Sequence, residues 1–182
     1  MDRNRRTENA VGPTRREYSG AALAAFTIVP RRVLGGQGHR APSDKLNIAG
    51  VGVGAMGGVY LQNCESENIV ALADVDFDFA ARTFARYPKA KTYQDYRVML
   101  DKEKSIDAVV IGTPDHTHAV IAMAAIRLGK HVYCAKPLCR TAGEVRAVAD
   151  AARKAGIATQ MSTQSAASEA ACATKEMLLS GI

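Results

Sequence analysis

Short apolar runs alternate with segments of helical character from about residue 45 to the end of the chain. Because these runs are too apolar for strands with one exposed face, they predict buried strands. The strands are expected at 45–51, 69–73, 92–93, 106–111, 131–134 and 157–161. Apolar residues three or four positions apart predict helices at 59–65, 77–87, 95–100, 116–128, 142–155 and 168–179.

Strands and helices that alternate along one chain predict an α/β fold with helices on both faces of the sheet and right-handed crossovers. For residues 45–182 we expect a doubly wound parallel sheet with strand order 3-2-1-4-5-6, as in the Rossmann fold. Open sheets of this kind bind ligands at the carboxyl ends of their strands, so the residues that follow each predicted strand are the candidates for chemistry.

The first 44 residues differ from this pattern. They contain the pair Arg15-Arg16, the apolar run 21–29 and a loop rich in Gly and Arg after Pro30, a layout that resembles a twin-arginine (Tat) export signal. Nine residues fall well short of the roughly 20 that span a bilayer, so we expect a signal and linker over 1–44, no stable membrane span, and a periplasmic or secreted protein. The alternative is a disordered basic tail on a cytoplasmic protein, because no small-x-small cleavage site precedes Ser43.

Composition supports one globular domain preceded by a tail. Of the 182 residues, 47% are hydrophobic and 23% charged, which suits a buried core. Eight of the 24 basic residues lie in the first 40 positions, and the rest of the chain has 16 basic against 15 acidic residues, interspersed. This balance argues against nucleic-acid binding. The four cysteines lack CxxC spacing, so we expect them to pack as small apolar side chains rather than to bind metal or form disulfides.

The strongest motif is Gly52-x-Gly54-x-x-Gly57, which follows the first predicted strand and opens a helix. Gly52 permits a tight turn, Gly54 allows the backbone to approach a pyrophosphate, and Gly57 allows the helix to pack closely on the strand. The start of the helix then supplies free N–H groups and the positive end of the helix dipole. The segment predicts a site for a dinucleotide cofactor.

An acidic residue, Asp74, ends the second predicted strand 22 residues after Gly52. A carboxylate at this place accepts hydrogen bonds from the ribose hydroxyls of the adenosine half and repels a 2′-phosphate, which favours NAD over NADP. Arg82 would favour NADP if its side chain reached back to this point. The alternative role for Asp74 is the N-cap of the next helix.

A second polar segment, Gly112-Thr113-Pro114-Asp115-His116-Thr117-His118, follows the fourth predicted strand and is expected to line the cofactor crevice. His116 and His118 are two positions apart, so their side chains diverge at the start of a helix and make a poor metal pair. We predict no metal site. Capping and surface roles are the alternatives for both histidines.

These motifs, together with Ala73-Asp74-Val75-Asp76 and Cys134-Ala135-Lys136-Pro137-Leu138, resemble the glucose-fructose oxidoreductase and inositol dehydrogenase (Gfo/Idh/MocA) family over residues 45 to about 180. The resemblance implies an NAD-dependent oxidoreductase of a sugar or cyclitol, in which Lys136 is catalytic and also lies near the nicotinamide. Without the resemblance, Lys136 reads as a surface lysine after a strand. The predicted cofactor-binding residues are Gly52, Gly54, Ala55, Met56, Gly57, Asp74, Thr113, Pro114, His116, His118 and Lys136.

The chain also departs from the family. Ala135 replaces the glutamate of the family's Glu-Lys-Pro motif. Met161-Ser162-Thr163-Gln164-Ser165-Ala166 stands where secreted relatives tend to show Gly-Asn-Gln-Gly-His, so an Asn and a His are replaced. Members continue into a second domain that carries the substrate pocket and the surface of a homo-oligomer, so the resemblance implies that this sequence is truncated. Two further hypotheses therefore stay open, namely a relative that uses bound NAD to cleave glycosides, and a nucleotide-binding module without catalytic activity.

Overall fold

The computed structural model describes residues 41–181, so the export-signal prediction lies almost entirely outside the described residues. The strands are β1 (Asn47–Val51), β2 (Asn68–Ala73), β3 (Lys91–Tyr93), β4 (Ala108–Ile111), β5 (His131–Cys134) and β6 (Thr159–Met161). The helices are α3 (Met56–Gln62), α4 (Phe77–Arg86), α5 (Tyr96–Lys102), α6 (Asp115–Arg127), α7 (Ala142–Ala155) and α8 (Glu169–Ser180), with short 3₁₀ turns η2 (Pro42–Asp44) and η3 (Gln164–Ala167).

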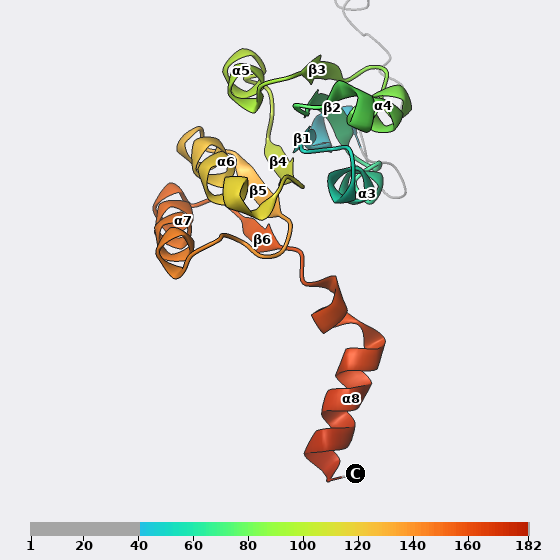
Figure 1. The fold of residues 1–182 in the computed structure, drawn as a ribbon, viewed down its shortest axis with the longest axis vertical. Helices are drawn as coiled ribbons and strands as arrows, with labels where there is room; N and C mark the ends of the chain where they lie inside the picture. The colour runs from blue at the N-terminus through green and yellow to red at the C-terminus, as the bar shows by residue number, and fades with distance from the viewer. Residues whose placement is uncertain (1–40, 182) are drawn as a thin grey trace, which may run out of the picture. The chain divides into compact units, whose positions relative to one another are not determined.

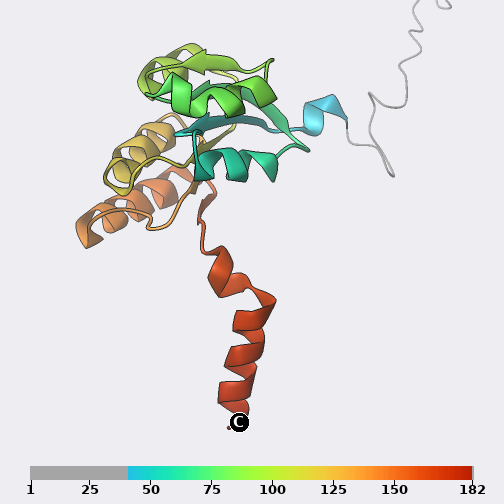
Figure 2. The same cartoon turned by 45° about the vertical axis from the view of Figure 1, so that its right-hand side comes forward.

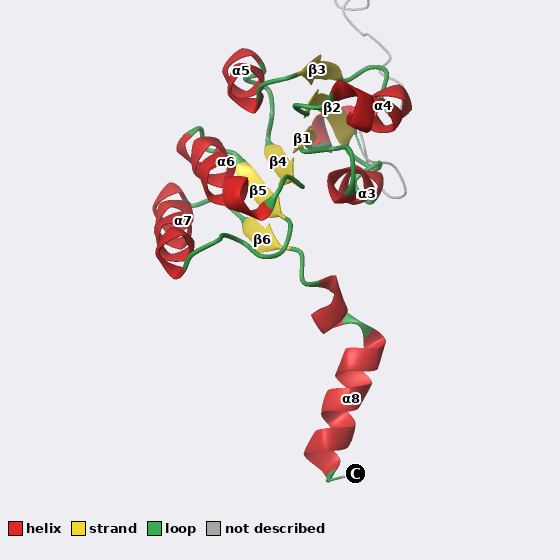
Figure 3. Cartoon of the chain, viewed as in Figure 1, coloured by secondary structure: helices red, strands yellow, loops and turns green. Residues whose placement is uncertain are grey.

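All six strands pair in parallel in the order β3-β2-β1-β4-β5-β6. This arrangement confirms the predicted doubly wound sheet and its strand order. The helices that alternate with the strands lie on its two faces (Figures 1 and 3). Among the described residues no helix is long and apolar enough to cross a membrane.

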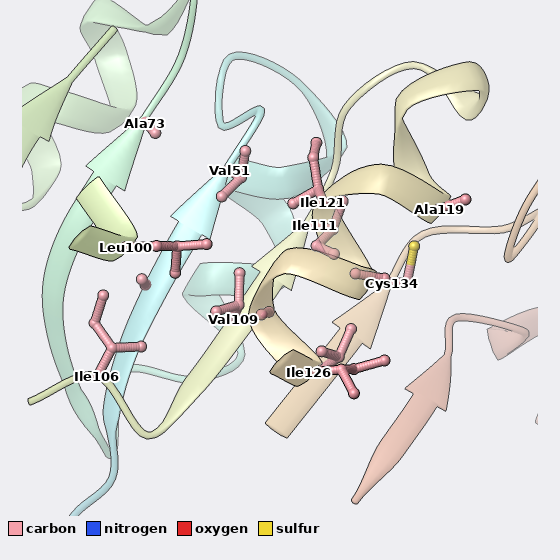
Figure 4. Packing of buried hydrophobic residues seen from close by; sticks show 14 of the residues in the cluster. Val51, Ala73, Leu100, Ile106, Val109, Ile111, Ala119, Ile121, Ile126 and Cys134 are labelled. Atoms are coloured by element: carbon pink, nitrogen blue, oxygen red, sulfur yellow. The ribbon is translucent and has the colours of Figure 1, made fainter. Parts of the chain in front are cut away.

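Two buried clusters, one on each face, hold the sheet together. The larger cluster combines strand residues such as Val109 and Ile111 with Ile121 of α6 (Figure 4). It also includes Met99 of α5 and Val148 of α7. The smaller one packs α3 and α4 on the opposite face through side chains that include Leu61 and Ala80, against Ile48, Val53, Leu72 and Val110 of the sheet side. The burial of these side chains is the main driving force that brings the strand ends together.

One helix begins earlier than predicted, and another, although predicted at its place, is not packed on the sheet. Helix α3 begins at Met56, three residues before the predicted start. It therefore includes Gly57 and Gly58, although glycine disfavours a helix interior. Helix α8 contains no buried residue, and Leu178 and Leu179 are 72% and 78% exposed. It extends away from the sheet in both views of the ribbon (Figures 1 and 2).

Candidate functional site

A cavity of about 530 Å³ opens at the carboxyl edge of the sheet, where β1, β2 and β4 end. Seven of the eleven predicted site residues line it, namely Gly52, Gly54, Ala55, Asp74, Thr113, Pro114 and His116. Four predicted residues, Met56, Gly57, His118 and Lys136, are not part of its lining. The cavity therefore unites three motifs that lie up to 64 positions apart in the sequence.

The glycine turn is built on direct backbone contact between β1 and β4. Gly52 has a φ of +74°, and a Cβ added to it would lie 2.6 Å from the backbone nitrogen of Thr113. A Cβ on Gly57 would collide with the carbonyl oxygen of Gly52, and one on Gly112 would lie 2.5 Å from the Cα of Gly57. Gly57 thus contributes by close packing, as predicted, and Gly112 is an equally constrained residue that the motif does not include.

Gly54 has a neighbour that the sequence did not indicate. A Cβ at this position would collide with the ring of Phe79, which comes from α4 and is 61% exposed. The missing side chain therefore leaves room for an aromatic ring at the cavity as well as for a ligand. Helix α3 follows this turn, and its N-cap residue Ala55 provides no side-chain hydrogen bond to the first turn.

The carboxylate of Asp74 stabilises the same turn from β2. Its Oδ2 accepts hydrogen bonds from the backbone N–H groups of Val53 at 2.7 Å and Gly54 at 3.0 Å. Its Oδ1 accepts one from Asp76 N at 3.1 Å. The alternative N-cap role is wrong, because α4 is capped by Asp76, whose side chain accepts from Phe79 N. Asp74 is half-buried and lines the cavity.

The two histidines of the β4 segment have different environments. His116 is exposed and lines the cavity. His118 is fully buried, with Nδ1 2.7 Å from the carbonyl oxygen of Pro137 and Nε2 2.8 Å from that of Thr113. The prediction that His118 contacts the cofactor is corrected accordingly, because both of its polar atoms are engaged by the protein backbone. No group of three or more potential metal ligands occurs in residues 41–181.

Lys136 follows β5, whose carboxyl end lies beside that of β4. Its side chain is exposed, and its backbone N–H donates to the hydroxyl of Ser162 at 3.1 Å. That hydroxyl also makes a 2.8 Å hydrogen bond with the hydroxyl of Tyr60 from α3. Lys136 therefore stands at the edge that carries the cavity, on a well-anchored backbone, and its catalytic role stays a prediction.

Cysteine thiols at this end of β5 are not candidates for nucleophilic chemistry. Burial raises the pKa of Cys134 to about 12 and also raises the pKa of Cys139. A thiol with a pKa this high stays protonated near neutrality. Cys134 and Cys139 fit the predicted packing role, whereas Cys172 is exposed.

Residue 135 is buried, whereas the neighbouring Lys136 is exposed. Ala135 is 8% exposed and belongs to the smaller apolar cluster. We expect Ala135→Glu to lower the free energy of unfolding by about 2 to 5 kcal/mol, because it places a carboxylate among apolar side chains. Urea unfolding measures this effect. Ala142→Glu, at the exposed first position of α7, serves as the control and should be neutral or slightly stabilising.

An unchanged urea midpoint in Ala135→Glu would contradict this reading. It would mean that the site accommodates the carboxylate.

Sequence reasoning missed the apolar part of the cavity. Its lining includes Val75, Phe79, Tyr96 and Val120, which come from the β2–α4 segment, α4, α5 and α6. Phe79 and Val120 are more than half exposed despite their size. Their spacing in the sequence resembles that of core residues, so no local signal separates them from the core.

Comparison with known proteins agrees with the predicted dinucleotide-binding fold. Residues 46–163 match the Gfo/Idh/MocA family model, described as an oxidoreductase family with an NAD-binding Rossmann fold. The chain is 38% identical over 86 residues to levoglucosan dehydrogenase of Pseudarthrobacter phenanthrenivorans, covering 47% of this chain and 22% of that protein. It is 33% identical over 117 residues to inositol 2-dehydrogenase of Klebsiella pneumoniae, covering 61% and 34%.

A solved structure of levoglucosan dehydrogenase in complex with NADH and L-sorbose superimposes with a TM-score of 0.65 at 28% identity. The match covers 75% of this chain and 39% of that one. This chain thus spans about a third or less of the length of these two curated relatives.

Proposed function

The chain belongs to the Gfo/Idh/MocA oxidoreductase family, which has an NAD-binding Rossmann fold, and we propose that its cavity binds NAD for the oxidation of a sugar or cyclitol hydroxyl by hydride transfer. The observation that carries the proposal is the half-buried carboxylate of Asp74, held beside the glycine turn at the end of β2. Levoglucosan and inositol dehydrogenases among the relatives support the class of substrate.

The residues of the cavity suit the parts of this cofactor. The turn at Gly52 and Gly54 offers backbone without side chains, beside the uncapped start of α3, for the pyrophosphate. Asp74 is placed to accept hydrogen bonds from the adenosine ribose. Thr113 and His116, at the end of β4, lie on the side of the cavity nearest to β5, which suits the nicotinamide half.

NAD supplies the hydride acceptor when it is bound. Oxidation of a secondary hydroxyl transfers hydride from carbon to the nicotinamide and leaves a proton to be removed from the oxygen, so that a carbonyl forms. Lys136 follows β5 at the same edge of the sheet, and its amine is the group that we assign to the hydroxyl. A lysine in such a place orients the oxygen and moves its proton.

Calorimetric titration of the chain with NAD and with NADP tests the cofactor assignment. We expect NAD to bind at least about tenfold more tightly, because a 2′-phosphate would meet the carboxylate of Asp74. Incubation with NAD and a panel of sugars and cyclitols, with NADH formation as the readout, then tests turnover. Equal affinities for the two cofactors would overturn the assignment to Asp74.

A nucleotide-binding module without turnover is the second candidate, favoured by Ala135, whose side chain packs in the core where the family motif has a glutamate. In that case NAD binds in the titration, yet no compound of the panel yields NADH. The Lys136→Met variant would then match the unaltered chain in every assay.

We also propose export through the twin-arginine pathway, supported by Arg15-Arg16 and the apolar run that follows them. Changing both arginines to lysine should retain the protein in the cytoplasm, which cell fractionation measures.

The family resemblance further suggests a homo-oligomer, which sedimentation of the purified chain tests.

A further inference from the structure

His118 lies on α6 with no exposed surface, and both of its ring nitrogens meet backbone carbonyl oxygens. Nδ1 is 2.7 Å from the oxygen of Pro137, and Nε2 is 2.8 Å from the oxygen of Thr113. These two carbonyls follow different strands, β5 and β4. The imidazole therefore forms a buried bridge between the two turns at the cavity edge.

The two contacts stand on opposite sides of one rigid ring. A carbonyl oxygen only accepts hydrogen bonds, so the ring donates to these partners through an N–H group. The ring is fully buried between the two carbonyl oxygens, and it keeps the segments that carry them at a fixed distance from each other.

The bridge reaches both sides of the proposed site. Thr113 lines the cavity, and Pro137 is bonded directly to Lys136. On the other side of the lysine, its backbone N–H donates a hydrogen bond to the hydroxyl of Ser162, which is 1% exposed. The same hydroxyl is hydrogen-bonded to that of Tyr60. Buried side chains from separate elements thus hold the main chain on both sides of Lys136.

We propose that His118 is a positioning residue that couples the cofactor turn at Thr113 to the turn that carries Lys136. The proposal rests on the proposed function for the importance of Lys136 but uses contacts that are independent of any cofactor. In this role His118 sets where the backbone of Lys136 stands relative to the cavity without touching a ligand.

The first test is NMR spectroscopy of the histidine rings in the 15N-labelled, cofactor-free chain. We expect the ring N–H of His118 to exchange slowly with solvent, because the ring is fully buried against carbonyl oxygens. His116 is the matched control, because it is exposed and its ring N–H should exchange fast. A ring N–H of His118 that exchanges as fast as that of His116 would overturn the proposal.

The second test follows Lys136 itself after 13C-methylation of the lysine amines, with its signal identified by Lys136→Arg. His118→Gln replaces a ring whose two nitrogens lie on opposite sides with an amide whose donors share one nitrogen, so we expect the Lys136 signal to shift or broaden. The signal of Lys91, on the edge strand β3 away from β5, should stay in place. A Lys136 signal identical to that of the unaltered chain would refute the coupling.

These outcomes do not depend on turnover or on NAD. If His118→Gln fails to fold, the exchange of the His118 ring N–H in the unaltered chain still tests the buried bridge. If NAD fails to bind, the proposed function is refuted while both readings stay interpretable.

Discussion

Replacing Asp74 with alanine is expected to weaken NAD binding by about a hundredfold or more. A hydrogen bond to a charged group contributes about 1.5 to 3 kcal/mol, and the ribose presents two hydroxyls to this carboxylate. The same change leaves the backbone N–H groups of Val53 and Gly54 without their acceptor. The glycine turn then loses its fixed shape, which adds to the loss of affinity and costs about 1 to 3 kcal/mol of stability.

Calorimetric titration with NAD measures the first effect, and urea unfolding the second. Asp78→Ala is the matched control, since Asp78 lies in the first turn of α4, is exposed and does not line the cavity. Its NAD affinity should equal that of the unaltered chain. If Asp74→Ala binds NAD as tightly as Asp78→Ala, Asp74 holds only the turn and the ribose contact is refuted.

The topology and the cavity edge follow from local sequence signals. The run Ala108–Ile111 is apolar on both sides, so it belongs in the middle of a sheet that helices cover on both faces. Alternation with helices then makes the sheet parallel and brings the residues after β1, β2 and β4 to one edge. Asp74 and Thr113 were predicted correctly at this edge because they lie one and two residues after the ends of β2 and β4.

What the sequence did not indicate depends on contacts between distant segments. The histidine of Thr117-His118 looks like one more polar residue after a strand, yet α6 turns it inward to two carbonyls, one of them 19 positions away. Ala135 and Lys136 are adjacent in the chain but have opposite environments, because a residue that leaves a strand still alternates between its two faces. Local patterns predict where a strand lies. They do not predict whether a side chain that follows the strand is buried or exposed.

Gly57→Ala should be the most destabilising of the single-methyl changes that we consider. Alanine is preferred to glycine within a helix by about 1 kcal/mol, and Gly57 lies inside α3. The added methyl group, however, would collide with the carbonyl oxygen of Gly52 and would also meet the Cα of Gly112 at 3.5 Å. Both neighbours are backbone atoms of packed strand ends, so they cannot rotate away as a flexible side chain does.

Overpacking of this kind costs about 3 kcal/mol or more, which exceeds the helix preference and is a large share of the 5 to 15 kcal/mol typical of a domain. Urea unfolding of Gly57→Ala measures the net effect, and NAD titration should show weaker binding because the turn at Gly52 is displaced. Gly143→Ala in α7 is the control, since the added Cβ would lie 3.9 Å from its nearest neighbour, Oγ1 of Thr141. A stabilised Gly57→Ala variant would mean that helix propensity outweighs the contact with β1, and that the glycine turn is not held by close packing against α3.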